Sequence, residues 1–253
     1  MRIEAVLFAG NIAKAHQKMA RVLAASAKQN CPSSQLTIHT ISGTDSEITA
    51  VRRSNLYLNN ARKTKHHRKI VHDARDGELV CLIDTDTMVL RDLAAIETYG
   101  ASADFDLAYT QPAAGAKYRI NSGVLFVRIS DSVRDFFDRW FLTVQQMLLD
   151  EPFHNRWRDF YGGINQAALG YLLESGVAGT TCGAAGGTGI KTLTLACDEW
   201  TCEPSSYDRF GEHTRVVHVM GNLRDCCLRR SQPDSRAIGR LRDIWKSYQS
   251  LAA

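Results

Sequence analysis

The sequence lacks the features that mark several classes of protein. No apolar run approaches the roughly 20 residues that a bilayer-spanning helix needs. The first residues place Arg2 and Glu4 inside what would be the apolar core of a signal peptide. The chain also contains no internal repeat and no low-complexity linker. These absences predict a cytoplasmic protein without a transmembrane segment, in which no linker separates independent domains.

The chain also has little excess charge of one sign. Its 253 residues include 31 Lys and Arg against 27 Asp and Glu, and this net charge of +4 does not by itself indicate a nucleic-acid or anionic-membrane partner. Apolar residues make up 44%, enough to bury a core at this length. The 7 cysteines are an odd number in a chain that needs no disulfides, so we predict mostly free thiols.

Apolar runs alternate with helical patterns in the first third of the chain. The run Ile3–Ala9 precedes helical spacing over Ile12–Gln29, and Leu36–Ile41 alternates as a strand does. Leu79–Ile83 is continuously apolar, which is typical of a strand buried on both faces. This alternation predicts an α/β fold, with a mostly parallel central sheet flanked by helices.

The same patterns continue to the end of the chain. Short strands are predicted near 106–109 and 123–128, and Asp131 is expected to cap a helix that runs to about Leu149. Pro233 is expected to open a final helix. The remaining predicted elements are a helix over Gly163–Glu174 and strands over Thr192–Ala196 and Val216–Met220.

Two carboxylates stand where the most apolar strand ends, in Asp84-Thr85-Asp86. Residues two apart in a strand face the same side, so both side chains are expected in one pocket at the carboxyl end of the sheet. Open α/β sheets bind their ligands there. Two carboxylates this close repel each other unless a cation lies between them, which indicates a divalent metal. The alternative interpretation is a turn at the end of the strand, in which both aspartates are solvated and bind no metal.

Later motifs decide between these interpretations. They are Asn121-Ser122-Gly123-Val124, the pair Asn165-Gln166, and His218-x-x-Gly221-x-x-Arg224. With the Asp pair, and in this order, the sequence resembles the nucleotide-sugar glycosyltransferases of the GT-A fold, of the glycogenin and bacterial lipopolysaccharide galactosyltransferase type. The similarity spans about Ile3–Arg224.

The resemblance implies a single GT-A domain over residues 1–253. Its nucleotide-binding half would be 1–95, its donor-sugar and acceptor half 96–225, and a C-terminal helix would occupy 226–253. It further implies that Asp84, Asp86 and His218 hold Mn²⁺ or Mg²⁺, and that the donor is a UDP-sugar. Arg224 stands where the family has Lys.

Catalytic roles are implied for Asp86, Gln166 and Asn165, the last standing where relatives often have Asp. Gln166 corresponds to the side chain placed under the anomeric carbon in the retaining relatives. Donor contacts are implied for residues of the first strand-to-helix turn, the basic helix before the Asp pair, the Asp pair itself, and the Asn-Ser-Gly-Val and C-terminal His motifs: Ala9, Asn11, Lys65, Asp84, Thr85, Asn121, Ser122, Gly221 and Arg224. Most of the basic segment Arg62–Lys69 is expected to be a solvated helix face, with nucleic-acid contact as the minority interpretation.

The expected function is metal-dependent transfer of a hexose from a UDP-sugar to an acceptor hydroxyl, with retention at the anomeric carbon. The sequence does not identify the acceptor: a saccharide is favoured, and a modified nucleic acid remains open. Oligomeric state is not indicated.

Three other interpretations of the sequence compete with this one. The main one is a haloacid-dehalogenase-type phosphatase with Asp84 as nucleophile and Asp86 as general acid, but that family usually places this motif on the first strand. A non-catalytic protein of the same fold is a second, although all three expected metal ligands are present. Sugar-1-phosphate nucleotidyltransferases need a Gly-rich basic loop that is absent from Phe8–Lys14.

Overall fold

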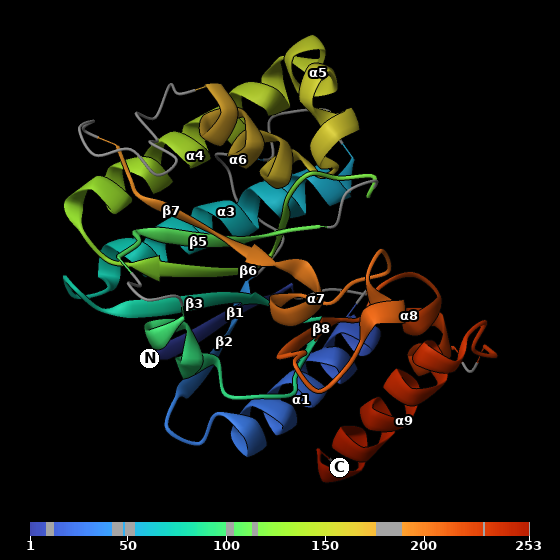
Figure 1. Cartoon of the computed structure of the whole chain (residues 1–253). Coiled ribbons are helices and arrows are strands. Elements are labelled where there is room, and N and C mark those ends of the chain that lie inside the picture. Colours follow the sequence, from blue (N-terminus) through green and yellow to red (C-terminus); the bar gives the residue numbers. More distant parts are fainter. Residues whose placement is uncertain are drawn as a thin grey trace.

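A six-stranded sheet forms the centre of the protein, with helices on both faces (Figure 1). In this computed structural model the described residues are 1–8, 13–41, 48, 54–99, 104–112, 116–175, 189–229 and 231–252. In sheet order the strands are β2 (Gln35–Ile41), β1 (Arg2–Phe8), β3 (Leu79–Asp84), β6 (Asn121–Arg128), β5 (Leu107–Gln111) and β7 (Thr192–Ala196).

Most neighbouring strands of this sheet are parallel. β1 pairs in parallel with β2 on one side and β3 on the other, and β5 pairs in parallel with β7. β6 runs antiparallel to both β3 and β5. The predicted α/β fold with a mostly parallel sheet is therefore confirmed. The reversal of β6 was not predicted, because an apolar run carries no information about strand direction.

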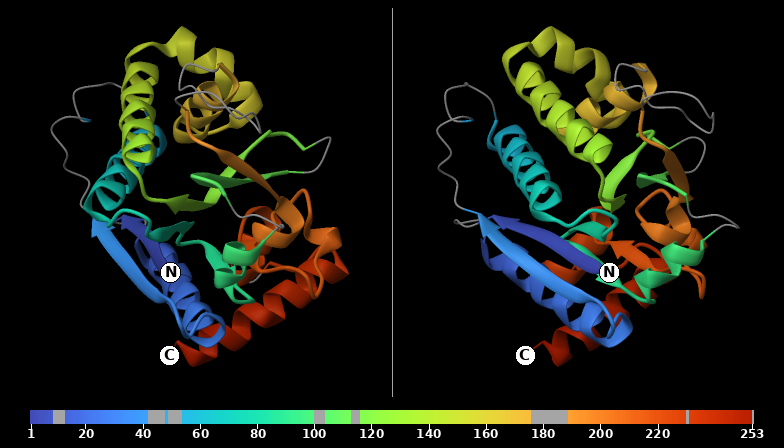
Figure 2. Two further views of the ribbon diagram at one scale, coloured as in Figure 1. Left: turned by 60° about the vertical axis from the view of Figure 1, so that its left-hand side comes forward. Right: turned by 90° about the vertical axis from the view of Figure 1, so that its left-hand side faces the viewer.

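Helices α3 (Asn55–Asp73), α4 (Asp131–Leu149) and α6 (Ile164–Ser175) cover one face of the sheet, and α5 (Glu151–Tyr161) packs against α4 and α6 (Figure 2). Val80 and Leu82 of β3 point into this layer, where Trp140 of α4 is fully buried. Successive residues of β3 alternate between the faces, which explains why the whole strand is apolar.

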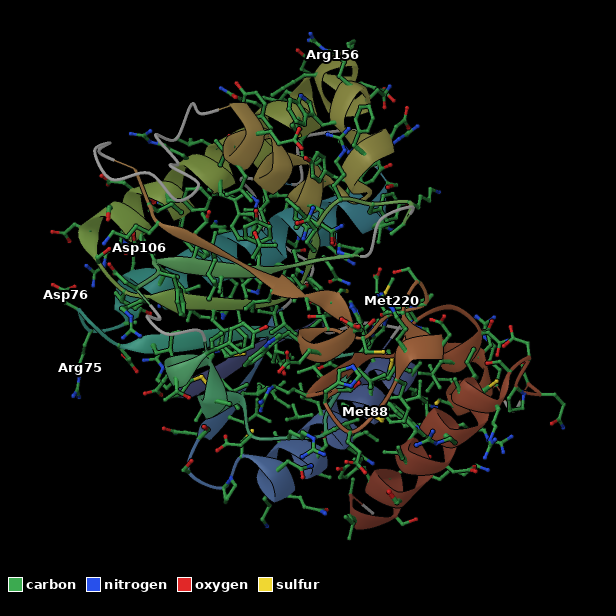
Figure 3. All side chains as sticks on the ribbon, viewed as in Figure 1. Arg75, Asp76, Met88, Asp106, Arg156 and Met220 are labelled. Carbon is green, nitrogen blue, oxygen red and sulfur yellow. The ribbon has the colours of Figure 1, made fainter. Side chains whose placement is uncertain are left out.

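Helix α1 (Ala13–Asn30) covers the other face, where Cys81 and Ile83 join a second apolar cluster. A third cluster links α1 to α8 (Gly221–Leu228) and α9 (Arg236–Leu251), and Met88 is buried within it. Figure 3 shows Met88 among the elements of this cluster, whereas Arg75 projects outward at the left of the view and Arg156 at the top. The remaining short helices are η1 (Leu93–Thr98), α7 (Cys197–Trp200) and η2 (Tyr207–Arg209).

Two helix starts differ from the prediction. The hydroxyl of Ser130, not the side chain of Asp131, caps α4 by accepting the Val133 N–H at 3.3 Å. Helix α9 begins at Arg236 behind a Ser235 cap rather than at Pro233. The expected boundary at residue 226 falls inside α8, so the C-terminal segment contains the end of one helix and the whole of another.

A second, two-stranded sheet joins distant parts of the chain. β4 (Thr87–Val89) pairs antiparallel with β8 (Val216–His218), and Thr87 lies opposite His218. The buried hydroxyl of Tyr207 donates to the His218 carbonyl and accepts the Met220 N–H at 3.1 Å. This pairing fixes the end of β8 beside the turn that follows β3.

The described cysteines are all free and buried, as predicted for thiols outside disulfides: Cys31, Cys81, Cys197, Cys202, Cys226 and Cys227. Cys182 lies outside the described residues. Within the described ranges, no helix is both long enough and apolar enough to cross a bilayer.

Candidate active site

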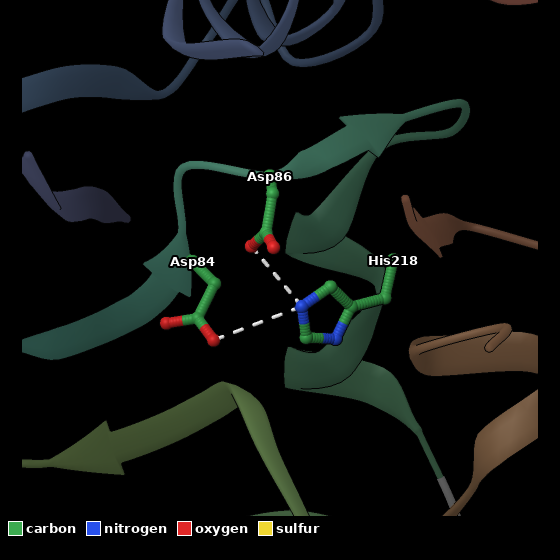
Figure 4. A group of neighbouring side chains, drawn as sticks. All are labelled: Asp84, Asp86 and His218. Carbon is green, nitrogen blue, oxygen red and sulfur yellow. Dashed lines mark hydrogen bonds and ion pairs between the residues drawn. The ribbon is translucent and has the colours of Figure 1, made fainter. Parts of the chain in front are cut away.

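Three metal-ligating side chains meet at the carboxyl end of β3 (Figure 4). Asp84 ends β3, Asp86 lies in the turn before β4, and His218 ends β8. The Nε2 atom of His218 is 3.1 Å from Asp86 Oδ1 and 3.8 Å from Asp84 Oδ2. The two carboxylates converge because the chain turns after Asp84. The prediction that both lie on the same face of one continuous strand is therefore wrong.

The geometry of this group suits a divalent cation. One ligand atom from each residue lies within 4.8 Å of the others, and no other such group of three occurs in the described part of the chain. Two carboxylate oxygens and an imidazole nitrogen are a donor set that Mn²⁺ and Mg²⁺ accept in proteins. Nδ1 of His218 is buried without a hydrogen-bond partner among described residues, so Nε2 is the nitrogen aimed at both carboxylates.

Gly123 sets the position of the His218 ring. A Cβ atom at residue 123 would lie 2.7 Å from both Nδ1 and Cε1 of His218, and 2.9 Å from Asn121 Oδ1. Such distances are shorter than van der Waals contact, so the ring fits only because residue 123 has no side chain. The Gly of the Asn-Ser-Gly-Val motif thus has a steric role beside the candidate metal ligands.

Two cations of the chain contact the same carboxylates. Lys63 Nζ of α3 is 2.7 Å from Asp84 Oδ1, and the Arg224 guanidinium of α8 donates to Asp86 Oδ2. Arg224 is held in place by a second hydrogen bond, from its Nε to the Val219 carbonyl at 3.0 Å. The two positive charges offset the two carboxylates, which leaves the cluster close to neutral.

The charges shift the pKa values of this cluster. Burial alone would raise the pKa of Asp86, but His218, Arg224 and Lys63 together hold it well below its usual range. Burial alone would lower the pKa of His218, but the Asp86 carboxylate, helped by Asp84, raises it. A proton and a metal ion therefore compete for Nε2 of His218.

Helix α3 contributes more buried charge than the sequence indicated. The segment Arg62–Lys69 was expected to be a solvated face, and this is wrong for half of it: Arg62, Lys63, Thr64 and His67 are buried, whereas Lys69 is exposed. Burial, with Lys63 nearby, lowers the pKa of His67 well below its usual value. The predicted donor contact Lys65 is half-buried on the same helix, while Lys63 is the cation that reaches Asp84.

The Asn165-Gln166 pair meets the Asn-Ser-Gly-Val motif at Ser122. Gln166 Nε2 donates to the carbonyls of Ile120 and Tyr161 at 2.8 and 2.7 Å, and its Oε1 accepts the Ser122 N–H at 3.2 Å and the Ser122 hydroxyl at 3.1 Å. Asn165 Nδ2 donates to Ser122 Oγ at 3.2 Å. Every donor and acceptor site of the Gln166 amide is engaged within the chain, so this side chain anchors the start of β6.

The other predicted donor residues are spread around the cluster. Asn121 is buried at the start of β6, Thr85 is buried in the turn between the two aspartates, and Gly221 begins α8 with φ of +51°. Ala9 and Asn11 lie outside the described residues.

Sequence reasoning missed three polar residues at the site: Lys63, Glu203 and Tyr207. The signal for Lys63 was its place in the basic helix, whose inner and outer faces the charge pattern alone could not distinguish. Glu203 and Tyr207 belong to no motif, and only the fold brings them next to the Asn-Ser-Gly-Val and His-x-x-Gly segments.

The fold and this site define the class of protein that the chain resembles: the GT-A glycosyltransferases. No protein-family model and no curated protein matches the chain. Several solved structures do match the chain. A glycosyltransferase involved in glycosylation of the major capsid of PBCV-1 matches with a TM-score of 0.59 and 11% identity, over 87% of this chain and 94% of that one.

Two further structures match at similar quality. The galactosyltransferase LgtC, solved with donor and acceptor sugar analogues, aligns over 98% of this chain and 96% of its own, with a TM-score of 0.56 and 13% identity. The glycosyltransferase GlyE of Streptococcus pneumoniae TIGR4 aligns over 99% of this chain and 62% of its own, with a TM-score of 0.56 and 16% identity. These structural alignments show that the chain shares the GT-A fold, as predicted, and at such low identities they show the fold alone.

Proposed function

We propose that the chain is a metal-dependent glycosyltransferase that transfers a hexose from a UDP-sugar to an acceptor hydroxyl. The observation that carries this proposal is the cluster of Asp84, Asp86 and His218 at the carboxyl end of β3, with Lys63 and Arg224 on its carboxylates. The GT-A fold supports the proposal, because open α/β sheets bind ligands at this edge.

The charges of the site suit a diphosphate leaving group. Asp84, Asp86 and His218 would hold Mn²⁺ or Mg²⁺, which when bound supplies Lewis-acid stabilisation of the departing diphosphate. Arg224 and Lys63 would place positive charge on phosphate oxygens as their negative charge increases. Gly221 begins α8, the helix that carries Arg224, so backbone N–H groups of that helix start would face the same anion.

The residues around the metal ligands have proposed roles in holding the donor. Asn121 and Ser122 would contact the sugar, and Thr85 and Lys65 the nucleotide or its phosphates. Ala9 and Asn11 would hold the nucleoside. Asn165 and Gln166 would support the reacting centre, Gln166 by fixing Ser122 through the contacts described above.

Three finer features of the proposal come from the family resemblance of the sequence. These are uridine as the nucleoside, a hexose as the transferred sugar, and retention at the anomeric carbon. We favour a saccharide over a modified nucleic acid as acceptor, because Arg62 and Lys63 of the basic segment that suggested nucleic acid are buried and Lys63 pairs with Asp84. The acceptor sugar analogue in the LgtC structure points in the same direction.

The structure disfavours the phosphatase alternative. A phosphatase of that type usually carries its nucleophilic Asp at the end of the first strand of the chain, whereas Asp84 ends β3. His218 also has no role in that chemistry, whereas metal binding accounts for its position between the two carboxylates.

UDP release tests the proposed function. Wild-type protein with Mn²⁺ and UDP-glucose or UDP-galactose should release UDP slowly without acceptor, and faster when the correct acceptor is present. EDTA should lower the rate at least about 100-fold, because the leaving diphosphate loses its Lewis acid. Added Mn²⁺ should restore the rate. Release of phosphate from p-nitrophenyl phosphate, with no UDP release, would favour the phosphatase instead.

A further inference from the structure

A carboxylate outside the predicted metal site lies against the predicted donor-binding motif. Glu203 follows Cys202, whose carbonyl accepts the His218 N–H at 2.8 Å. Glu203 Oε2 accepts a hydrogen bond at 2.8 Å from Nδ2 of Asn121, which is the first residue of the Asn-Ser-Gly-Val motif. The contact joins residues 82 positions apart, so the tertiary fold creates it.

The turn that carries Glu203 is held by its own hydrogen bonds. The Ser206 hydroxyl accepts the Glu203 N–H at 3.0 Å, and the Ser205 hydroxyl donates to Glu203 Oε1 at 2.8 Å. Each carboxylate oxygen therefore accepts a hydrogen bond from a described residue. A carboxylate offers about four lone-pair sites, so two acceptor sites remain for a ligand. The side chain is half-buried, which leaves it accessible to a ligand while fixing its direction.

This turn lies between two parts of the proposed donor site. Pro204 is the nearest neighbour of Gly221, where a Cβ would be 3.7 Å from Pro204 Cγ. On the other side, Asn121 Oδ1 accepts the Gly123 N–H at 2.7 Å, and Gly123 abuts the His218 ring. Contacts through Asn121 and Gly123 thus connect Glu203 to the candidate metal ligand His218.

We propose that Glu203, with Asn121, binds hydroxyl groups of the donor hexose and so determines which sugar the protein accepts. A carboxylate with free acceptor sites beside a carboxamide is suited to a pair of neighbouring hydroxyls, because the carboxylate accepts from the O–H groups and the carboxamide adds polar contacts. A nucleoside diphosphate lacks the hexose hydroxyls, and its ribose hydroxyls belong to the nucleoside end of the donor, which the proposed function assigns to Ala9 and Asn11. Glu203 should therefore add little to the affinity for UDP. The proposal rests on the proposed function.

The test compares UDP with UDP-hexoses in the variant Glu203→Gln. Glutamine keeps the size of the side chain and an oxygen for Asn121, but it loses the charge and part of the acceptor capacity. We expect Glu203→Gln to weaken binding of UDP-glucose or UDP-galactose about tenfold, while the affinity for UDP changes less than about twofold. Calorimetric titrations with Mn²⁺ and without acceptor measure both affinities.

The matched control is Glu199→Gln. Glu199 lies four positions earlier in the chain and pairs with Arg215 at 3.0 Å, and we assign it no role in the site. The variant Glu199→Gln should leave the affinities for UDP and for the UDP-hexose unchanged. Equal weakening of UDP and UDP-hexose by Glu203→Gln would indicate a merely structural role and overturn the proposal. So would an effect confined to the KM of the acceptor.

The two proposals fail in different ways. If wild-type protein with Mn²⁺ binds neither UDP nor a UDP-hexose, the proposed function is wrong. If wild-type protein binds both ligands and Glu203→Gln binds both equally well, the role of Glu203 is wrong while the proposed function stands. A thermal melt of each variant separates either result from loss of folding.

Discussion

Replacing Asp86 with asparagine should nearly abolish metal-dependent UDP release. The change removes one carboxylate ligand and leaves Arg224 and His218 without their shared negative partner. Changes to residues that only support metal ligands typically cost 10–100-fold in metal affinity, so loss of a ligand should cost at least about 100-fold. Loss of the associated charge stabilisation should lower the rate about 1,000-fold.

Mn²⁺ affinity and UDP release measure this effect together. Asp92→Asn is the matched control, because Asp92 is exposed, lies outside the candidate metal ligands and caps η1, a task that asparagine performs equally well. The control should retain wild-type affinity and rate. An Asp86→Asn variant that folds, binds Mn²⁺ normally and releases UDP at the wild-type rate would remove Asp86 from the site.

The variant Gly123→Ala should weaken metal binding at least about tenfold without touching a metal ligand. The new Cβ would lie 2.7 Å from two atoms of the His218 ring, so the ring must move away from its present contact with Asp86. Ligand positions off by a fraction of an ångström are enough to lose an order of magnitude in affinity. The change should also lower stability by about 1–3 kcal/mol, as overpacking in a buried strand does.

Gly239→Ala provides the control for this substitution. Gly239 lies in α9, where a Cβ would meet nothing closer than 4.0 Å, and alanine in a helix is more favourable than glycine. The control should leave metal affinity unchanged and stability equal or slightly higher. Mn²⁺ titrations and thermal melts of both variants provide the comparison; unchanged metal affinity in Gly123→Ala would show that His218 does not depend on this contact.

The sequence predicted the parts of the site that local patterns encode. Leu79–Ile83 is apolar throughout because both faces of β3 are buried, and a ligand-binding turn directly follows such a strand in open α/β sheets. The spacing of His218 from Gly221 and Arg224 identifies it as a candidate metal ligand. The pairing of β4 with β8 explains how its side chain reaches Asp86.

Other features depend on tertiary contacts that the sequence does not reveal. The charge pattern of Arg62–Lys69 is that of a solvated helix, yet Lys63 is buried because Asp84 lies within reach of its amine. Glu203 meets Asn121 only after the segment between α7 and η2 folds against the start of β6. The direction of β6 likewise follows from its neighbours in the sheet.

Titration of Mn²⁺ into the wild-type protein, with and without UDP, tests the central claim most directly. Because Lys63 and Arg224 offset the charges of Asp84 and Asp86, we expect weak binding of Mn²⁺ alone and binding at least about tenfold tighter when UDP supplies phosphate oxygens for both cations. Electron paramagnetic resonance of free Mn²⁺ measures both affinities. No saturable Mn²⁺ binding in the presence of UDP, or equal binding in the Asp86→Asn variant, would contradict the proposed metal-dependent transfer site.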